Sequence, residues 1–415
     1  MDTASQYRRF LIVLAVGFAS LCALAAGINY LVDPYGLFGT PRVDGINALK
    51  PTAGERVRTT KPYMATAFGP TTVIAGNSRP ELGLDPQSTC WSEDDKPVFN
   101  SGIPGAGFYM QTQYAKHALS AGNGRKVLLA IDFLDFLTDT TTPDAAFPPD
   151  WTSMSASYAG RLDIPGENAG VWTIISTRAQ DKLSALFSLN TLADSLLTIT
   201  RQRTPFITDR RADGFNPGND YEAIVRNEGQ FVLFKQKNGE LATRLDRPGL
   251  GLFPAGQEHS ADFEALKNFL AWSQAEKVEV ILFINPYHVD YFRIIHAAGL
   301  WTELENWKRH ITRIAGDFGV PLWDFNSVDA FSSEAPPAQG KRGTSISWYW
   351  EPAHYKREMG ELMLAKLLGR RCSADQPAAT PGTKLSPDNL EQHLARLRME
   401  LSSLSMGSAQ PEARD

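Results

Sequence analysis

The chain has 415 residues, a formal net charge of -5 and a sequence pI near 5.9. Hydrophobic residues make up 43% of it and charged residues 21%, which excludes a disordered chain, and the acidic balance argues against nucleic-acid binding. No phosphate loop, dinucleotide fingerprint or metal motif is present, and no two of the three cysteines have metal-ligand spacing. We therefore expect a globular protein without metal or cofactor, built as two domains or one enlarged domain.

The N-terminal segment predicts a membrane anchor. Arg8 and Arg9 precede an uncharged run, residues 10–32, which is long enough to cross a bilayer. Ala23-Leu24-Ala25 resembles a signal-peptide cleavage site, but the apolar region of a signal peptide spans only about 7 to 15 residues, so we favour an uncleaved anchor. Because basic flanks stay in the cytoplasm, residues 1–9 are expected there and the remaining chain on the other side of the membrane.

Two further features concern the translocated part. Residues 33–70 are rich in Gly, Pro, Thr and basic residues without sustained periodicity, and they predict a stalk that packs on the following domain. In an oxidising compartment Cys90 and Cys372 can form a disulfide, and two buried free thiols are the alternative.

Residues 71–372 predict an α/β domain. Five runs of apolar and β-branched residues have the pattern of buried strands: 71–75, 97–100, 126–133, 278–285 and 320–325. Helical apolar stripes lie between and after them, the clearest at 263–270, 304–318 and 359–367, and Thr302 with Glu305 has capping-box spacing. Strands that alternate with helices predict a parallel five-stranded sheet covered on both faces, a three-layer α/β/α fold.

Two segments interrupt or follow this alternation. Residues 138–257 carry a helix-like segment near 177–200 and a hairpin pattern at Phe231–Phe234 with the turn Lys237-Asn238-Gly239. A loop of this length is rarely structureless, so we expect an insertion subdomain that covers the rim of the site. Residues 373–415 predict a linker and a short, loosely docked helix with one leucine face.

The sharpest chemical signal is the stretch Thr71-Thr72-Val73-Ile74-Ala75-Gly76-Asn77-Ser78-Arg79-Pro80. A buried strand here ends in a small polar turn, and the carboxyl end of a parallel strand is where ligands bind. Ser78 is therefore a candidate nucleophile, although a serine at such a place is often only a helix or turn cap.

A serine nucleophile needs a histidine base and an acid that orients the histidine. Tyr349-Trp350-Glu351-Pro352-Ala353-His354-Tyr355 offers both within four residues, with His354 as the base and Glu351 as the acid. His288, after the fourth strand, is the competing base. The aromatic residues beside His354 suit either stacking on sugars or core packing, the commoner role.

Gly76-Asn77-Ser78, the turn with Asn100 and Gly105 after the second strand, and Glu351-Pro352-Ala353-His354 before a final helix occur in the order seen in SGNH hydrolases (GDSL-like esterases). The chain resembles their membrane-anchored branch associated with polysaccharide acylation, including the alginate acetylation proteins. The resemblance implies a flavodoxin-like fold and a single-pass protein of the bacterial inner membrane with a periplasmic domain. It also implies Ser78 as nucleophile, His354 as general base, and the amides of Ser78 and Gly105 as the oxyanion hole.

The sequence departs from the family pattern at three positions. Asn77 replaces the usual Asp, Glu351 replaces the Asp before the histidine, and Asp132 stands where the third strand should supply an Asn donor. An ionised Asp132 has no hydrogen to donate. Asn285, at the end of the fourth strand, is a possible substitute, although it also suits a turn before Pro286.

Arg79 suits either an anionic group of the substrate or a salt bridge with Glu81 or Asp85. The expected activity is transfer of an acyl group, which the resemblance implies is acetyl, between an ester and a polysaccharide hydroxyl or water. A membrane protein that passes acyl groups outward is an expected partner. The alternative is an inactive relative that binds glycan or scaffolds a polysaccharide assembly.

Overall fold

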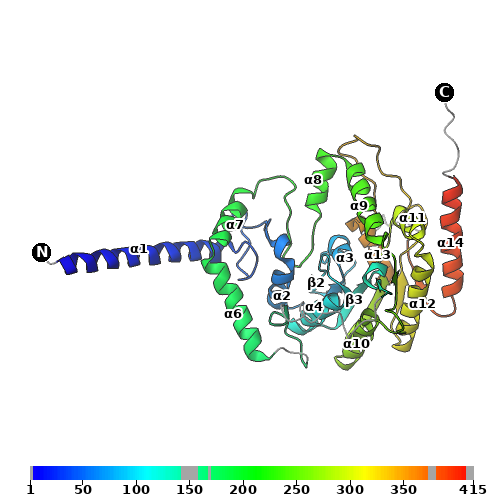
Figure 1. The fold of residues 1–415 in the computed structure, drawn as a ribbon, viewed down its shortest axis with the longest axis horizontal. Helices are drawn as coiled ribbons and strands as arrows, with labels where there is room; N and C mark the ends of the chain where they lie inside the picture. The colour runs from blue at the N-terminus through cyan, green and yellow to red at the C-terminus, as the bar shows by residue number, and fades with distance from the viewer. Residues whose placement is uncertain (1–2, 142–157, 167–169, 373–379, 408–415) are drawn as a thin grey trace.

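The computed structural model describes residues 3–141, 158–166, 170–372 and 380–407. It is a mixed α/β protein whose central sheet has six strands in the order β10-β7-β6-β3-β1-β2 (Figure 1). The five predicted strands are present and mutually parallel: β1 (Thr72–Ala75), β2 (Val98–Asn100), β3 (Lys126–Ile131), β6 (Glu279–Ile284) and β7 (Leu322–Asp324).

The predicted count of five strands was wrong by one. β10 (Thr383–Leu385) joins the edge of the sheet antiparallel to β7, and it comes from the segment that was predicted to be a linker. A three-residue edge strand has no room for a periodic pattern, and it is held by backbone pairing with β7.

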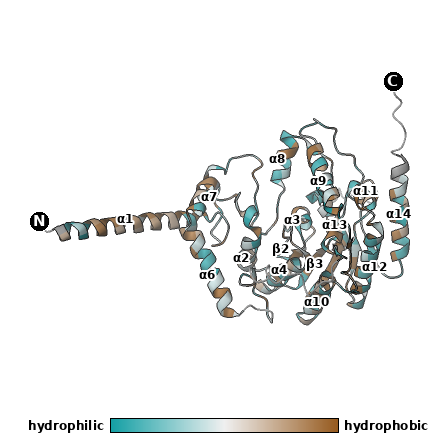
Figure 2. Ribbon diagram, viewed as in Figure 1, coloured by the Kyte–Doolittle hydropathy of each residue, from teal (hydrophilic) through white to brown (hydrophobic). Residues whose placement is uncertain are grey.

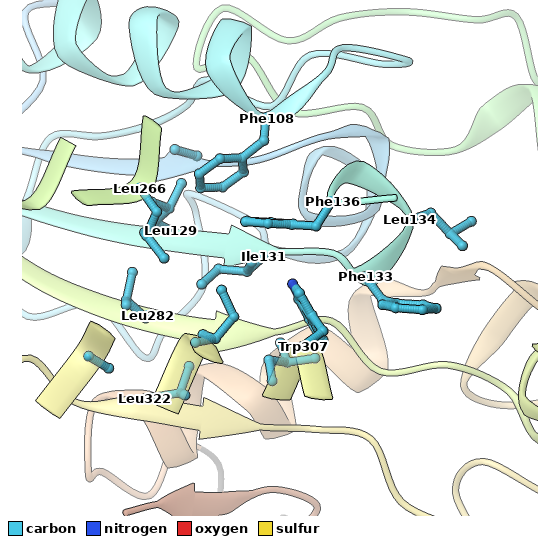
Figure 3. Close-up of a cluster of buried hydrophobic side chains, with 14 of the residues drawn as sticks. Phe108, Leu129, Ile131, Phe133, Leu134, Phe136, Leu266, Leu282, Trp307 and Leu322 are labelled. Atoms are coloured by element: carbon cyan, nitrogen blue, oxygen red, sulfur yellow. The ribbon is translucent and has the colours of Figure 1, made fainter. Parts of the chain in front are cut away.

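Helices cover both faces of the sheet, because successive strand residues point to opposite sides. On one face, Val127, Leu129 and Ile131 of β3 pack in a cluster with α4 (Phe108–Ala121), α10 (Ala261–Ala275) and α12 (Trp301–Asp317). Figure 3 shows Leu129 and Leu282 among side chains of this cluster. On the other face, Leu128 and Ala130 pack in a second cluster with α13 (Arg357–Leu367).

The remaining elements of the domain are short or peripheral. They are α3 (Ser78–Gly83), η2 (Glu93–Asp95), η3 (Phe133–Asp135), α11 (Val289–Ala297), β8 (Tyr349–Glu351) and β9 (His354–Tyr355). The predicted capping box at Thr302 is wrong, since α12 begins at Trp301 and its N-cap, Leu300, makes no side-chain cap. The helix ends near Gly319 as predicted, where φ is +66°.

The C-terminal helix α14 (Leu390–Gly407) is docked much more firmly than predicted. Leu390, Leu394 and Leu401 belong to the main core cluster. His393 Nε2 lies 2.8 Å from a carboxylate oxygen of Asp324 at the end of β7. The leucine face therefore contributes to the core of the domain.

In the described residues, the predicted insertion includes the helices α6 (Val171–Phe187), α7 (Leu189–Thr200), α8 (Asn219–Asn227) and α9 (Gln230–Leu245), and a two-residue pairing of β4 (Thr138–Asp139) with β5 (Leu250–Gly251). Residues 142–157 and 167–169 of it lie outside the described residues. The predicted hairpin is wrong, because Asn238-Gly239 continues helix α9. Burial of Leu233, Phe234 and Leu241 on one helical face outweighs the local turn signal.

At the N-terminus, α1 (Thr3–Val32) is long and apolar enough to cross a membrane. The segment 33–70 is more regular than predicted, with η1 (Ala53–Arg56) and α2 (Val57–Phe68), which packs on α4. Cys90 and Cys372 are joined by a disulfide, so of the two alternatives the structure has the paired form.

Candidate functional site

Ser78 lies at the point where β1 turns into α3. Gly76 allows this turn, because its φ is +147° and a Cβ atom would lie 2.7 Å from the side chains of Ala130 and Pro80. The Asn77 side chain caps α3 by accepting a hydrogen bond from the Arg79 amide at 3.0 Å. Since Asn77 performs the capping, the hydroxyl of Ser78 is not needed for it.

The β8–β9 hairpin brings His354 and Glu351 to this serine. The Oγ of Ser78 lies 2.7 Å from Nε2 of His354, across 276 positions of sequence. The other ring nitrogen, Nδ1, contacts a carboxylate oxygen of Glu351 at hydrogen-bond range. The second oxygen of Glu351 accepts the Ala353 amide at 2.6 Å. The structure thus brings the three predicted side chains into one hydrogen-bonded row.

The charge of Glu351 sets the tautomer of the histidine. Burial by itself raises the pKa of Glu351, but the neighbouring His354 and the Ala353 amide lower this pKa below its ordinary value of 4.5. An ionised carboxylate only accepts hydrogen bonds, so Nδ1 carries the proton and donates it to Glu351. Nε2 is then left with a lone pair directed at the Ser78 hydroxyl.

Glu351→Gln tests this orientation. We expect kcat/KM with an acetyl ester to fall roughly 10²- to 10⁴-fold, because a neutral amide can present an NH₂ group to Nδ1 and reverse the tautomer. Glu222→Gln, in a half-exposed pair with Arg226 on α8, is the matched control and should change little.

The same variant has a signature in stability. Because the folded-state pKa of Glu351 is lowered, its carboxylate stabilises the wild type above pH 4.5, and this stabilisation is lost as the pH falls through the folded-state pKa. Unfolding free energies measured across the acid range should therefore fall less in Glu351→Gln than in wild type. Equal acid slopes would contradict an ionised Glu351 in the folded protein.

Arg79 forms a buried ion pair, but with neither of the expected partners. Its guanidinium contacts Asp132, its Nη2 donates to the Tyr291 hydroxyl at 2.8 Å, and its Nε donates to the Ala353 carbonyl at 2.9 Å. Asp132 also accepts from the Tyr287 hydroxyl at 2.8 Å. Through these contacts Arg79 links the turn that carries Ser78 to the hairpin that carries His354.

The structure separates the predicted oxyanion and binding residues. Gly105 lines the same pocket as Ser78, with φ of +63°, and among the described residues its amide donates no hydrogen bond. Asn100 does not line this pocket: it is fully buried, and its amide donates to the carbonyls of Pro80 and Leu84. Asn285 is also buried away from it, where its Oδ1 accepts from Tyr355 at 3.3 Å. Neither asparagine has a donor facing the pocket.

His288 and the aromatic residues also have structural partners. His288 is the N-cap of α11, and its Nε2 lies 3.0 Å from the Glu334 carbonyl, so it does not contact Ser78. Tyr349 and Tyr355 are fully buried in the core, and Trp350 packs on Tyr221 outside the pocket. None of these aromatic rings lines the pocket.

The pocket around Ser78 has a volume of about 470 Å³ and opens to solvent. Sequence reasoning missed the helix that forms one of its walls, α9, which contributes Lys237, Glu240, Leu241 and Arg244. These residues were missed because Lys237-Asn238-Gly239 was predicted to be a hairpin turn. The helical spacing of the leucines within residues 230–245 is the signal that would have placed them on one helix.

Asp135, just after β3, is a further pocket residue that the sequence did not indicate. Burial and the charge of Asp132 raise the pKa of Asp135 to about 7. Its carboxyl group accepts hydrogen bonds from the Gln111 side chain at 2.8 Å and the Asn77 side chain at 3.3 Å. Asp135 thus ties the Ser78 turn to α4 and adds a titrating group at the floor of the site.

The fold and the site together define an α/β protein with a serine, a histidine and a glutamate in contact at the carboxyl edge of a mostly parallel sheet. No family model matches the chain, and no curated protein matches it.

Proposed function

We propose that the protein is a membrane-anchored serine acyltransferase or esterase of the SGNH type, acting on a polysaccharide of the cell envelope or exterior. The observation that carries the proposal is the 2.7 Å contact between Ser78 Oγ and His354 Nε2, with Glu351 on the opposite ring nitrogen. Three side chains in this order perform nucleophilic acyl transfer on many unrelated folds.

The proposed reaction has two halves. His354 Nε2 removes the Ser78 proton as Oγ attacks the ester carbonyl, and the imidazolium then returns the proton to the leaving alcohol, which leaves an acyl-serine. In the second half His354 deprotonates a sugar hydroxyl or water, which attacks the acyl carbon and restores Ser78. The oxyanion formed in each half is expected to accept from the amides of Ser78, the first residue of α3, and Gly105.

The lining of the pocket supports a hydrophilic substrate. Asn77, Asp135, Lys237, Glu240 and Arg244 surround the serine, whereas sites for long acyl chains are lined mainly by apolar side chains. A volume of about 470 Å³ is within the range of small-molecule sites and accommodates a short acyl group on a sugar ring. These features favour an acetylated glycan over a lipid ester.

One observation favours a second function, glycan binding without turnover. Asp132 occupies the third-strand position of the expected Asn donor and is paired with Arg79, so this position supplies no side-chain donor to the oxyanion hole. The backbone amides of Ser78 and Gly105 remain as donors. Reactivity of Ser78 with an acylating probe tests whether these two amides suffice to stabilise the oxyanion.

A fluorophosphonate probe distinguishes the two functions. We expect the full-length protein in detergent to be labelled on the peptide that contains Ser78, and Ser120→Ala, a serine on α4 outside the pocket, to be labelled equally. Heat-denatured protein should not react. Absence of labelling in the folded wild type would overturn the enzyme and favour the binding protein. Acetate release from an acetyl ester, with and without acceptor glycan, then separates esterase from transferase.

A further inference from the structure

The α6–α7 pair has an exposed face that is unusual for a water-soluble domain. Beyond α1, eight of the twelve large apolar residues that are exposed in the described part of the chain lie on these two helices. Trp172 is 82% exposed and Leu189 77% exposed. The eight are Val171, Trp172, Ile175, Leu183, Phe187, Leu189, Leu196 and Ile199. Gathered exposed apolar residues of this kind mark a binding surface.

Most charged residues of the pair face the domain. Asp181 accepts hydrogen bonds from Arg161 and from the Tyr63 hydroxyl, both at 2.6 Å, and Asp194 accepts from the Tyr35 hydroxyl at 2.5 Å. Within residues 171–200, Lys182 is the one charged side chain that is exposed. A helix pair that exposes apolar side chains and turns most of its charges toward the domain is suited to contact with lipid.

The pair is continuous with the membrane-spanning candidate α1. Figure 1 shows α1 projecting from the protein, with α6 and α7 running across its C-terminal end, and both helices contact it. Figure 2 shows hydrophobic residues along α1 and recurring on α6 and α7. Any bilayer that α1 crosses therefore ends close to this apolar face.

Asn29, near the end of α1, fixes the junction. Its side-chain amide is fully buried and donates to the carbonyls of Leu186 at 2.9 Å, Ala185 at 3.2 Å and Ser188 at 3.3 Å, where α6 ends. Its Oδ1 accepts from Ser195 of α7 at 3.0 Å. Helix-end carbonyls are costly in an apolar medium unless they are paired, and here α1 itself pairs them.

Neither helix of the pair is long enough to form a second span by itself, and the hydrogen bonds of Asp181 and Asp194 to Tyr63 and Tyr35 keep the bent pair beside the domain. The two helices have 17 and 12 residues and meet at 66°. At 1.5 Å per residue they are about 25 and 18 Å long, and neither reaches across a hydrocarbon core of about 30 Å. Helices of this kind lie in the plane of the membrane interface.

We propose that α6 and α7 form an interfacial membrane-binding platform, whose exposed apolar face is buried in the phospholipid bilayer that α1 spans. The platform and α1 would hold the domain with its pocket at a fixed height and orientation over the membrane, in place of a flexible tether.

Spin-label accessibility tests the platform. The full-length protein is placed singly in nanodiscs of phosphatidylethanolamine and phosphatidylglycerol, in a Cys22→Ser background that leaves the Cys90–Cys372 disulfide in place. Labels at Ile175→Cys and Leu189→Cys are compared with a label at Val13→Cys on α1 and one at Met399→Cys on α14, positions that are 70% and 66% exposed. Oxygen, which concentrates in lipid, and a nickel chelate, which stays in water, are the relaxing agents.

We expect residues 175 and 189 to be reached by oxygen and shielded from nickel, at a depth of about 5–10 Å, shallower than residue 13. Residue 399 should be reached by nickel. Nickel access at 175 and 189 equal to that at 399 would overturn the proposal. Exclusion of both agents at 175 and 189 would overturn it as well, because the face would then be covered by protein.

Discussion

Ser78→Ala is expected to lower kcat/KM for an acetyl ester at least about 10³-fold, a loss of about 4 kcal/mol of transition-state stabilisation. The hydroxyl that forms the acyl bond is removed, while the amides of Ser78 and Gly105 and the His354–Glu351 pair stay in place. The fold should be unaffected, because the cap of α3 comes from Asn77. Initial rates and thermal unfolding of the same preparations measure both quantities.

A double variant makes this prediction more specific. Residues that act as one catalytic unit are strongly non-additive, so Ser78→Ala combined with His354→Gln should be no slower than the slower single variant. If the fold-losses in kcat/KM of the two single variants multiply in the double variant, the serine and the histidine act independently. Unchanged turnover in Ser78→Ala would exclude Ser78 as the nucleophile, whatever its distance from His354.

Arg79→Met is expected to lower the free energy of unfolding by about 3–5 kcal/mol. Arg79 and Asp132 are 7% and 1% exposed, and methionine leaves the Asp132 carboxylate buried without a cation, with only the Tyr287 hydroxyl and the Leu134 amide as described hydrogen-bond donors to it. An unpaired buried charge costs far more than a surface ion pair contributes. Urea titrations monitored by tryptophan fluorescence would give the difference.

The matched control is Lys96→Met, which breaks an exposed pair with Glu93 and should cost less than about 1 kcal/mol. Adding Asp132→Asn to Arg79→Met removes the stranded charge and should recover part of the loss. A cost for Arg79→Met no larger than that of Lys96→Met would show that the pair is not desolvated in the folded protein.

Short-range pattern predicted much of the fold. The apolar runs of the five parallel strands and the stripes of α10, α12 and α13 are each contained within one segment, so their period can be read directly. The predictions failed where a segment is stabilised by contacts with distant parts of the chain. Asn238-Gly239 was predicted to be a turn but is helical, because one face of α9 is buried, and β10 forms a strand by pairing with β7.

The site shows the same division. Ser78, Glu351 and His354 were proposed from two local motifs, and Arg79 was expected to form an ion pair. Its partner, Asp132, lies just after β3, 53 positions further along the chain, and nothing in the spacing of the chain indicates that contact. Asn100 was expected to be a donor at the site because it precedes a glycine-rich turn, but its side-chain amide donates to the carbonyls of Pro80 and Leu84.

The sequence by itself determined the five parallel strands, the helical stripes of α10, α12 and α13, the apolar N-terminal helix, and which residue types stand at strand ends. These properties depend on periodicity and on near neighbours. Tertiary structure alone decided that a hydroxyl and an imidazole 276 positions apart lie 2.7 Å from each other, and that Asp181 and Asp194 of α6 and α7 face the domain while eight large apolar residues of the pair are exposed. The physical reason is that hydrogen bonding and burial act over a few ångströms of space, whereas a pattern in the chain records only distance along the backbone.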